Sequence, residues 1–408
     1  MQSILRYAAL ALALASGSIC LFPPAAFGVQ ATGQQPNQQR PRRVTKGETQ
    51  SPAKTSSEPA AEEVDEGDVV RVETQLVSVP AVVTNSAGRP VPGLRAENFL
   101  LFENGQPQKI TNFTTTEAPF EIALLLDTSG STRVDVGLIR QAANAFIDAL
   151  RPGDRVAIVG FNTARQGQSV AAKVEVLSQL TDDRKLLRTA IESLGSSNGT
   201  PFYDALERIA SEVLHEAPRE EVRGRRAVVA LTDGVDSTSV SDFQTARSML
   251  GRVGVACYFI EVNTEDFVED RLLKDCQDDG RLTLSEKQLQ RYRQVFFPRA
   301  RPEDLVDFCQ MGPFERMQIS RDLYNLARRE MDEVAKASGG RNFLAASLQD
   351  ARAAFARVAA EIGTQYSLGY YPTNKARDGK FRTIRVEVQG STDKPQVRAR
   401  EGYYAPRS

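Results

Sequence analysis

The sequence has very little of two residue types that carry much of protein chemistry. Among its 408 residues there are one histidine, His215, and no tryptophan. Catalytic triads, histidine-ligated zinc sites and most haem sites need imidazole, so a single histidine argues against all three classes. Any metal chemistry of this chain must therefore rely on oxygen ligands.

The chain also lacks an excess of charge. Its 51 Lys and Arg residues against 52 Asp and Glu residues leave a formal net charge of -1. Nucleic-acid binding needs clustered positive charge, so we expect no nucleic-acid partner. The four cysteines, Cys20, Cys257, Cys276 and Cys309, form neither a Cys-x-x-Cys pair nor a disulfide-dense pattern. We interpret Cys257 as a buried thiol, whereas Cys276 and Cys309 could form a disulfide after export.

The first 67 residues are expected to be an export signal and a linker. Residues 1–28 combine a basic start at Arg6, a short apolar stretch and small residues at the exit, which is the order of a secretory signal peptide. Residues 29–67 contain no aromatic side chain and should form a disordered linker. We therefore expect an exported protein, periplasmic or secreted, with no stable membrane span after cleavage. A retained N-terminal anchor is the alternative.

The remaining sequence predicts an α/β domain between two β segments. Residues 68–116 and 366–408 are typical of short strands, and Asn104-Gly105 between apolar runs is a hairpin signal. Residues 117–365 alternate apolar runs with amphipathic helices, the pattern of a doubly wound, mostly parallel sheet covered on both faces. We expect the two flanking β segments to pair into one small sandwich.

The pattern also predicts individual elements. The expected central strands are 122–126, 156–161, 227–231 and 255–262, with an antiparallel edge strand at 174–177 and a short strand at Phe343. The expected helices include residues 184–194, a helix that contains Leu206, Ile209 and Val213, a helix from Arg321 through Ala337, and residues 348–362. The strands expected in the C-terminal segment are 366–371, 384–388 and 397–404.

Three polar segments lie where a ligand crevice is expected. The run Asp127-Thr128-Ser129-Gly130-Ser131 follows the first apolar strand, Thr232-Asp233-Gly234 ends the third, and Asn198-Gly199-Thr200 precedes a helix. In an open α/β sheet, ligands bind at the carboxyl ends of the strands. A carboxylate followed by two hydroxyls can present three oxygens to a hard divalent cation. The alternative is that Asp127 and Ser129 merely cap the loop and the following helix.

These segments resemble the metal-ion-dependent adhesion site of von Willebrand factor type A domains. The flanking segments, residues 68–113 and 369–406, resemble those of exported bacterial proteins built around such domains. Asp127, Ser129 and Ser131 match the Asp-x-Ser-x-Ser motif, and Thr200 and Asp233 match the threonine and second aspartate of the family. The resemblance covers about residues 119–363 and implies a Rossmann-like fold.

The resemblance also implies how the site would bind metal. Ser129 and Ser131 would bind Mg²⁺ directly, Thr200 directly or through water, and Asp127 and Asp233 mainly through water. Mn²⁺ or Ca²⁺ are alternative ions. The last coordination position would be open to an Asp or Glu side chain of a partner protein.

An insertion at residues 264–320 is longer than the connection usual in this family. Within it, residues 275–286 have the spacing of an EF-hand calcium loop: Asp275, Gln277, Asp279 and Glu286 fall on positions that bind Ca²⁺. Gln277 departs from the pattern, because a shorter side chain is usual there. The expectation of a second Ca²⁺ site competes with a solvated helix-turn-helix.

These motifs together predict an exported, metal-dependent adhesion or interaction module, and not an enzyme. One alternative is a metal-dependent hydrolase using the same ion, for which the sequence offers no assignable general base. The other is a structural envelope-assembly protein in which the metal only stabilises the fold. The sequence does not fix the oligomeric state or the identity of the ligand.

Overall fold

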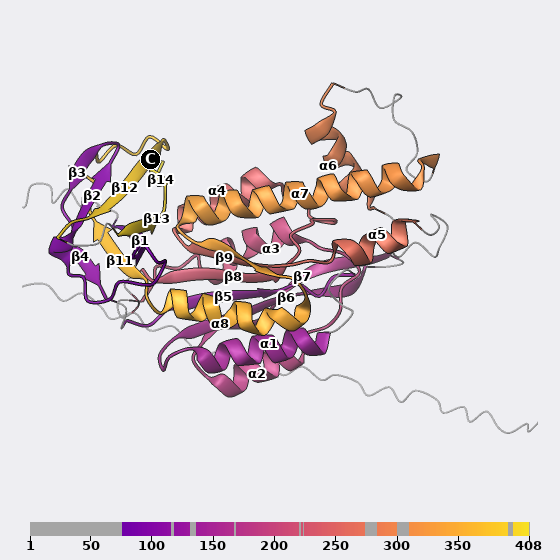
Figure 1. Ribbon diagram of the computed structural model, residues 1–408, viewed down its shortest axis with the longest axis horizontal. Helices are drawn as coiled ribbons and strands as arrows, with labels where there is room; N and C mark the ends of the chain where they lie inside the picture. Colours follow the sequence, from indigo (N-terminus) through magenta and orange to yellow (C-terminus); the bar gives the residue numbers. More distant parts are fainter. Residues whose placement is uncertain are drawn as a thin grey trace, which may run out of the picture. The chain divides into compact units, whose positions relative to one another are not determined.

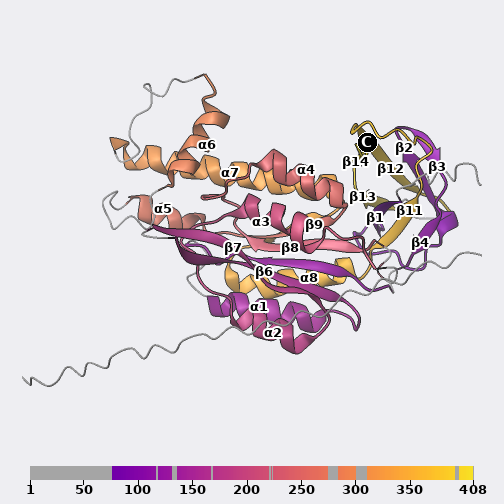
Figure 2. The ribbon, with the colours of Figure 1, turned by 180° about the vertical axis from the view of Figure 1, so that it is seen from behind.

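The computed structural model describes residues 76–115, 118–130, 136–166, 169–219, 222, 224–273, 284–299, 310–390 and 395–407 (Figures 1 and 2). The chain divides into two units, Met1–Val69 and Val70–Ser408, and all described residues belong to the second. The predicted signal peptide and linker, together with Cys20, Cys276 and Cys309, lie outside the described residues. Within the described ranges, no helix has the length and apolar character that a membrane span requires.

A six-stranded sheet with the order β10-β9-β8-β5-β6-β7 forms the centre of the α/β domain. Its strands are β5 (Glu121–Leu126), β6 (Arg155–Gln166), β7 (Ser169–Thr181), β8 (Arg226–Thr232), β9 (Ala256–Val262) and β10 (Arg341–Ala345). All neighbouring strands are parallel except β6 and β7, which pair antiparallel. The predicted mostly parallel sheet and its antiparallel edge strand are therefore confirmed.

Helices cover both faces of this sheet (Figure 1). One layer holds α1 (Val136–Ala149), α2 (Arg184–Glu192) and α8 (Ala351–Ile362), and the other holds α3 (Phe202–Arg208), α4 (Phe243–Val253) and α7 (Pro313–Ser338). Successive side chains of a strand point to opposite faces, so in β5 Leu124 packs in the first layer and Leu125 in the second. The sheet is thus buried on both faces, as its continuous apolar strands predict.

Two helices differ from the sequence-based expectation. Helix α7 begins at Pro313, eight residues before the expected start at Arg321. Its first turns are stabilised by tertiary packing, because Ile319 and Leu323 are buried against Leu272 of α5 (Glu265–Leu273). The helix predicted through Val213 is α-helical only to Arg208 and continues as the π-helical turn η3 (Ile209–Val213).

The flanking β segments form two four-stranded sheets, β13-β1-β11-β4 and β14-β12-β2-β3. Their strands are β1 (Val77–Thr84), β2 (Phe99–Glu103), β3 (Gln106–Gln108), β4 (Asn112–Thr114), β11 (Tyr366–Tyr370), β12 (Phe381–Val388), β13 (Gln396–Ala399) and β14 (Gly402–Tyr404). β1 pairs with β11 and β13, and β2 pairs with β12. Val79 and Leu101 share one buried core with Tyr366 and Ile384. The predicted pairing of the two segments is confirmed.

The single strand predicted at 397–404 is wrong: β13 and β14 belong to different sheets. The chain turns at Arg400, whose buried guanidinium donates to the carbonyls of Gly402 (2.9 Å), Ser78 (3.2 Å) and Gly251 (3.0 Å). Burial lowers the pKa of Arg400 to about 10. Because Gly251 belongs to α4, the hydrogen bond from Arg400 to its carbonyl also connects the sandwich to the α/β domain.

Candidate metal centre

The site begins where two neighbouring parallel strands end. Leu126 of β5 lies opposite Leu231 of β8, and the N–H of Asp127 donates to the carbonyl of Leu231 over 3.0 Å. The next residues, Asp127 on one side and Thr232 and Asp233 on the other, are therefore brought together by strand register. This is the carboxyl edge of an α/β sheet, where ligand sites form.

Asp127 is fully buried and held from two directions. One carboxylate oxygen accepts the N–H of Ser129 over 2.9 Å, and the other accepts the hydroxyl of Thr232 over 2.6 Å. Burial and the nearby charge of Asp233 raise the pKa of Asp127 to about 7, although these hydrogen bonds act in the opposite direction. Two carboxyl groups thus interact electrostatically with almost no access to water, which makes it unfavourable for both to be charged.

Asp233 is held in the same way. Its Oδ1 accepts the N–H of Val235 over 3.1 Å, and its Oδ2 accepts the hydroxyl of Thr264 over 2.7 Å. The Thr264 hydroxyl lies 2.8 Å from the hydroxyl of Tyr324 in α7. Both aspartates already receive hydrogen bonds on each oxygen, an arrangement compatible with carboxylates that act on an ion through water.

The loop that carries Thr200 lies against the other two loops. The N–H of Thr200 donates to the Ser237 hydroxyl over 2.8 Å, and the N–H of Ser237 donates to the Thr200 carbonyl over 3.0 Å. On the other side, the N–H of Ser197 donates to the Thr128 carbonyl over 2.9 Å. The structure therefore brings the loops of Asp127, Ser129, Thr200 and Asp233 to one place, with all four residues buried. Ser131 lies outside the described residues.

Two glycines allow these loops to approach closely. Gly234 has a φ of +75°, and a Cβ placed on it would lie 2.6 Å from Cε of Met331 in α7. A Cβ on Gly199 would lie 2.6 Å from Cγ2 of Thr238. Both positions favour glycine, the first because of its left-handed backbone and the second because of its close packing.

The donor set fits a hard divalent cation. It combines two buried carboxylates with neutral hydroxyls, which are oxygen ligands of the kind that Mg²⁺ takes. A cation nearby would also relieve the repulsion between Asp127 and Asp233 that raises the pKa of Asp127. Across the described ranges, no group of three or more His, Cys, Asp or Glu side chains is arranged so that it could hold a metal ion. The expected site needs only two of them, since its other members are hydroxyls.

Three supporting residues were missed by sequence reasoning: Asp236, Thr264 and Tyr324. Thr264 and Tyr324 come from the insertion and from α7, far from the motif in sequence, and no local pattern marks them. Asp236 did leave a signal, because it opens the polar run Asp236-Ser237-Thr238-Ser239 directly after the third motif segment. Aspartates in such runs commonly accept backbone N–H groups.

Most of the expected calcium loop lies outside the described residues. Asp275, Gln277 and Asp279 lie outside the described residues, while Glu286 opens helix α6 (Glu286–Phe296). Helix α5 ends at Leu273, just before the loop, and helix α6 begins at its last residue. Calcium binding in this loop stays a prediction. Cys257, by contrast, is buried as expected, and burial raises the pKa of its thiol to about 12.

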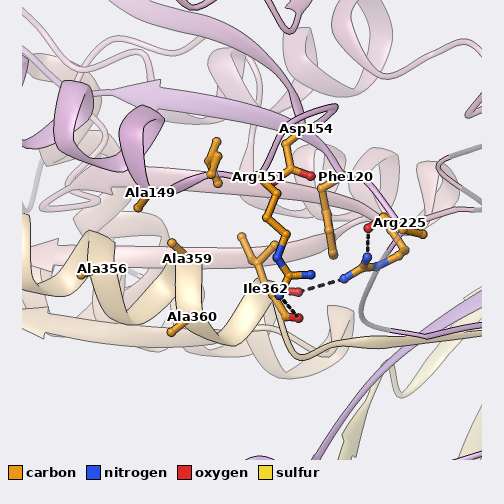
Figure 3. A pocket seen from close by; sticks show the side chains of 12 residues that line it. Phe120, Ala149, Arg151, Asp154, Arg225, Ala356, Ala359, Ala360 and Ile362 are labelled. Carbon is orange, nitrogen blue, oxygen red and sulfur yellow. Dashed lines mark hydrogen bonds between the residues drawn. The ribbon is translucent and has the colours of Figure 1, made fainter. Parts of the chain in front are cut away.

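A cavity of about 320 Å³ lies at the other end of the sheet (Figure 3). Phe120 and Arg225, at its wall, stand at the beginnings of β5 and β8. The Arg225 guanidinium lies 4.2 Å from the centre of the Phe120 ring and donates to the Ile362 carbonyl over 3.1 Å. Arg151 donates to the carbonyl of Gly363 over 3.0 Å. Of the described residues, Asp127, Ser129, Thr200 and Asp233 do not line this cavity.

Residues 122–235 match the family model of the von Willebrand factor type A domain. The matched stretch runs from β5 into the loop after β8, so it contains all five expected metal ligands. Among curated proteins, none matches the chain significantly.

Solved structures with similarity to the chain include three proteins. Proximal thread matrix protein 1 from the mussel byssus is 12% identical with a TM-score of 0.37, covering 61% of this chain and 49% of that one. A von Willebrand factor type A protein from Catenulispora acidiphila is 12% identical with a TM-score of 0.39, covering 82% and 74%. Three N-terminal domains of the type V pili tip protein Mfa5 from Porphyromonas gingivalis are 15% identical with a TM-score of 0.23, covering 40% and 26%. This chain thus spans about half the length of the mussel protein.

Proposed function

Residues 122–235 belong to a von Willebrand factor type A domain, and from this premise we propose that the protein is an exported interaction module that binds its partner through a Mg²⁺ ion. Domains of this family often mediate protein–protein interaction. The proposed ion site consists of Asp127, Ser129, Ser131, Thr200 and Asp233. The proposed partner is a protein that presents an Asp or Glu side chain.

One observation carries this proposal: Asp127 and Asp233 are buried side by side at the ends of two neighbouring strands, with the Thr200 loop hydrogen-bonded alongside. Burying two carboxylates close together is unfavourable unless something compensates their charge. Asp127 accepts hydrogen bonds from the N–H of Ser129 and the hydroxyl of Thr232, and Asp233 accepts them from the N–H of Val235 and the hydroxyl of Thr264. These donors are neutral, and a bound cation would add the positive charge that they do not carry.

The residues have distinct roles in this proposal. When bound, Mg²⁺ would supply a positive centre that attracts a carboxylate. The hydroxyls of Ser129, Ser131 and Thr200 would bind the ion without neutralising its charge. The ion would therefore still attract an acidic side chain of the partner. Asp127 and Asp233, each fixed by two hydrogen bonds, would orient the water molecules around the ion.

A cross-linked capture from the envelope of the source cell tests the proposal. Wild-type protein should retain a partner in Mg²⁺ and lose it in chelator, whereas Asp127→Ala should retain none in either condition although it stays folded. Capture that is insensitive to chelator contradicts the mechanism.

The same protein preparations distinguish the two alternatives. Mg²⁺-dependent turnover of a generic phosphoester would indicate a hydrolase. A melting temperature that rises with Mg²⁺, without any Mg²⁺-dependent partner, would indicate that the metal only stabilises the fold. Sequencing the N-terminus of the mature chain tests export, for which we expect cleavage after Ala26 or Gly28.

A further inference from the structure

The carboxylate of Asp236 gathers hydrogen bonds from two separate segments. Its Oδ2 accepts the N–H groups of Phe202 (2.8 Å) and Tyr203 (3.2 Å), the first residues of α3. Its Oδ1 accepts the N–H of Ser239 (3.1 Å), and the Ser239 hydroxyl donates to Oδ2 as well. One partly buried side chain therefore joins the start of α3 to the loop that follows β8.

These two segments are the ones that carry two of the proposed ligands. Thr200 lies two residues before the first partner of Asp236, and Asp233 lies three residues before Asp236 itself. Ser237, the residue next to Asp236, exchanges two hydrogen bonds with Thr200. Asp236 and Ser237 together thus fix the position of the Thr200 loop relative to the Asp233 loop.

The insertion also donates hydrogen bonds to the loop that follows β8. The hydroxyl of Ser285, at the start of α6, donates to the carbonyl of Ser237 over 2.7 Å. The ammonium of Lys287 donates to the carbonyls of Thr238 (3.0 Å) and Ser239 (2.7 Å). The backbone of 237–239 is therefore bound on one side by α6, while Asp236 binds α3 on the other.

We propose that Asp236 is a positioning residue for the metal site, which sets the separation of Thr200 and Asp233 without touching the ion or the partner. This inference rests on the proposed function, because it concerns the same ion. Mg²⁺ demands near-ideal octahedral geometry at about 2.0–2.1 Å, so a small displacement of one ligand loop weakens binding. Residues that orient metal ligands from outside typically contribute about 10–100-fold in metal affinity.

Asp236→Asn is the informative substitution. It keeps the size of the side chain but replaces one acceptor oxygen with an NH₂ group, which must face an N–H or O–H donor. The four hydrogen bonds cannot all be kept, and the two loops lose part of their connection. We expect the affinity for Mg²⁺ to fall by about 10–100-fold.

Asp183→Asn is the matched control. Asp183 caps α2 by accepting the N–H groups of Lys185 (2.8 Å) and Leu186 (3.3 Å), and α2 packs on the opposite face of the sheet from α3. It is the same substitution at a helix start, and among the described residues its side chain accepts hydrogen bonds only from Lys185 and Leu186, not from the metal loops. Its affinity for Mg²⁺ should equal that of the wild type.

The test is a calorimetric titration of the full chain with Mg²⁺ alone, for wild type, Asp236→Asn, Asp183→Asn and Asp127→Ala, well below their melting temperatures. Hydrogen exchange at Phe202, Tyr203 and Ser239 is followed in chelator, where we expect faster exchange in Asp236→Asn only. If Asp236→Asn does not fold, Ser239→Ala, which removes one donor and keeps the carboxylate, replaces it and should weaken Mg²⁺ binding several-fold.

The outcomes separate this inference from the proposed function. Mg²⁺ binding by the wild type and not by Asp127→Ala upholds the site; unchanged affinity in Asp236→Asn then overturns only the positioning role. An equal loss in Asp183→Asn overturns that role too, because the effect would be one of general stability. A wild type that does not bind Mg²⁺ overturns both.

Discussion

Thr264 donates its hydroxyl to the carboxylate of Asp233 over 2.7 Å and is itself 2.8 Å from the Tyr324 hydroxyl. Thr264 is the first residue of the insertion, and Tyr324 lies in α7, the helix that begins within the insertion and continues beyond it. The insertion is thus connected through Thr264 to Asp233, a proposed metal-site residue. Through Ser285 and Lys287 it is also connected to residues 237–239, in the loop that follows Asp233.

Replacing Thr264 with valine should destabilise the protein. The shape of the side chain is kept, but Asp233 and Tyr324 each lose a buried hydrogen-bond partner. We expect the free energy of unfolding to fall by about 1–3 kcal/mol in denaturant titrations. Thr189→Val, which removes an exposed hydroxyl bound to the Lys185 carbonyl, is the control and should change little. Equal effects in both variants would contradict the role of Thr264.

Two glycine substitutions should have opposite signs. Gly234 has a left-handed backbone packed against Met331, so Gly234→Ala should destabilise by roughly 1–2 kcal/mol from backbone strain alone. Gly251 lies inside α4 with no atom near its missing Cβ, so Gly251→Ala should stabilise by about 0.5–1 kcal/mol. Thermal melts compare the two, and a stabilising Gly234→Ala would refute the packing described for this loop.

Neutralising Asp127 should separate fold stability from metal response. Asp127→Asn removes a charge that burial and Asp233 disfavour, and the Thr232 hydroxyl, unlike a backbone N–H, can rotate to accept a hydrogen bond from the new NH₂ group. In chelator the variant should therefore be at least as stable as the wild type. Added Mg²⁺ should raise the melting temperature of the wild type and leave the variant unchanged. If the variant melts higher in Mg²⁺ by the same amount, the stabilising ion binds elsewhere.

The β sandwich should depend on both ends of the chain. A protein limited to residues 117–408 lacks β1 to β4, which leaves β11 and β12 without the partners β1 and β2. Exposed strand edges and an opened core should lower its stability and promote aggregation relative to residues 68–408. Equal denaturation midpoints for the two proteins would show that the pairing contributes little.

The calcium prediction for residues 275–286 has its own test. Calorimetry with Ca²⁺ should show a binding event in the wild type that is lost in a variant carrying Asp275→Ala and Glu286→Ala. An identical titration in both proteins would eliminate the site and favour the simple helix-turn-helix.

The sequence allowed the strands and the hairpin to be predicted because their signals are local. Continuous apolar runs identify buried parallel strands, and Asn104-Gly105 supplies the positive φ angles, 47° and 78°, of a tight turn. The start of α7 and the break at Arg400 could not be predicted. They depend on Leu272, Ser78 and Gly251, which lie far from them along the chain.

Of the candidate site, the motif residues could be predicted from the sequence, but the residues that support them could not. The positions of Asp127 and Asp233 follow from a motif at strand ends, and strand register brings them together. The residues that hold them, Thr264 and Tyr324, could not be predicted because tertiary packing alone places them there. The roles of the ligands toward a metal stay a prediction.

The most direct test of the central claim is a crystal structure of the protein grown with Mn²⁺, an ion visible by its anomalous scattering. We expect one strong anomalous peak at the carboxyl ends of β5 and β8, next to Ser129 and Thr200 and close enough to Asp127 and Asp233 for contact through a water molecule. The same peak should be absent from crystals of Asp127→Ala. No peak at this edge of the sheet in the wild type, or an undiminished peak in the variant, would contradict it.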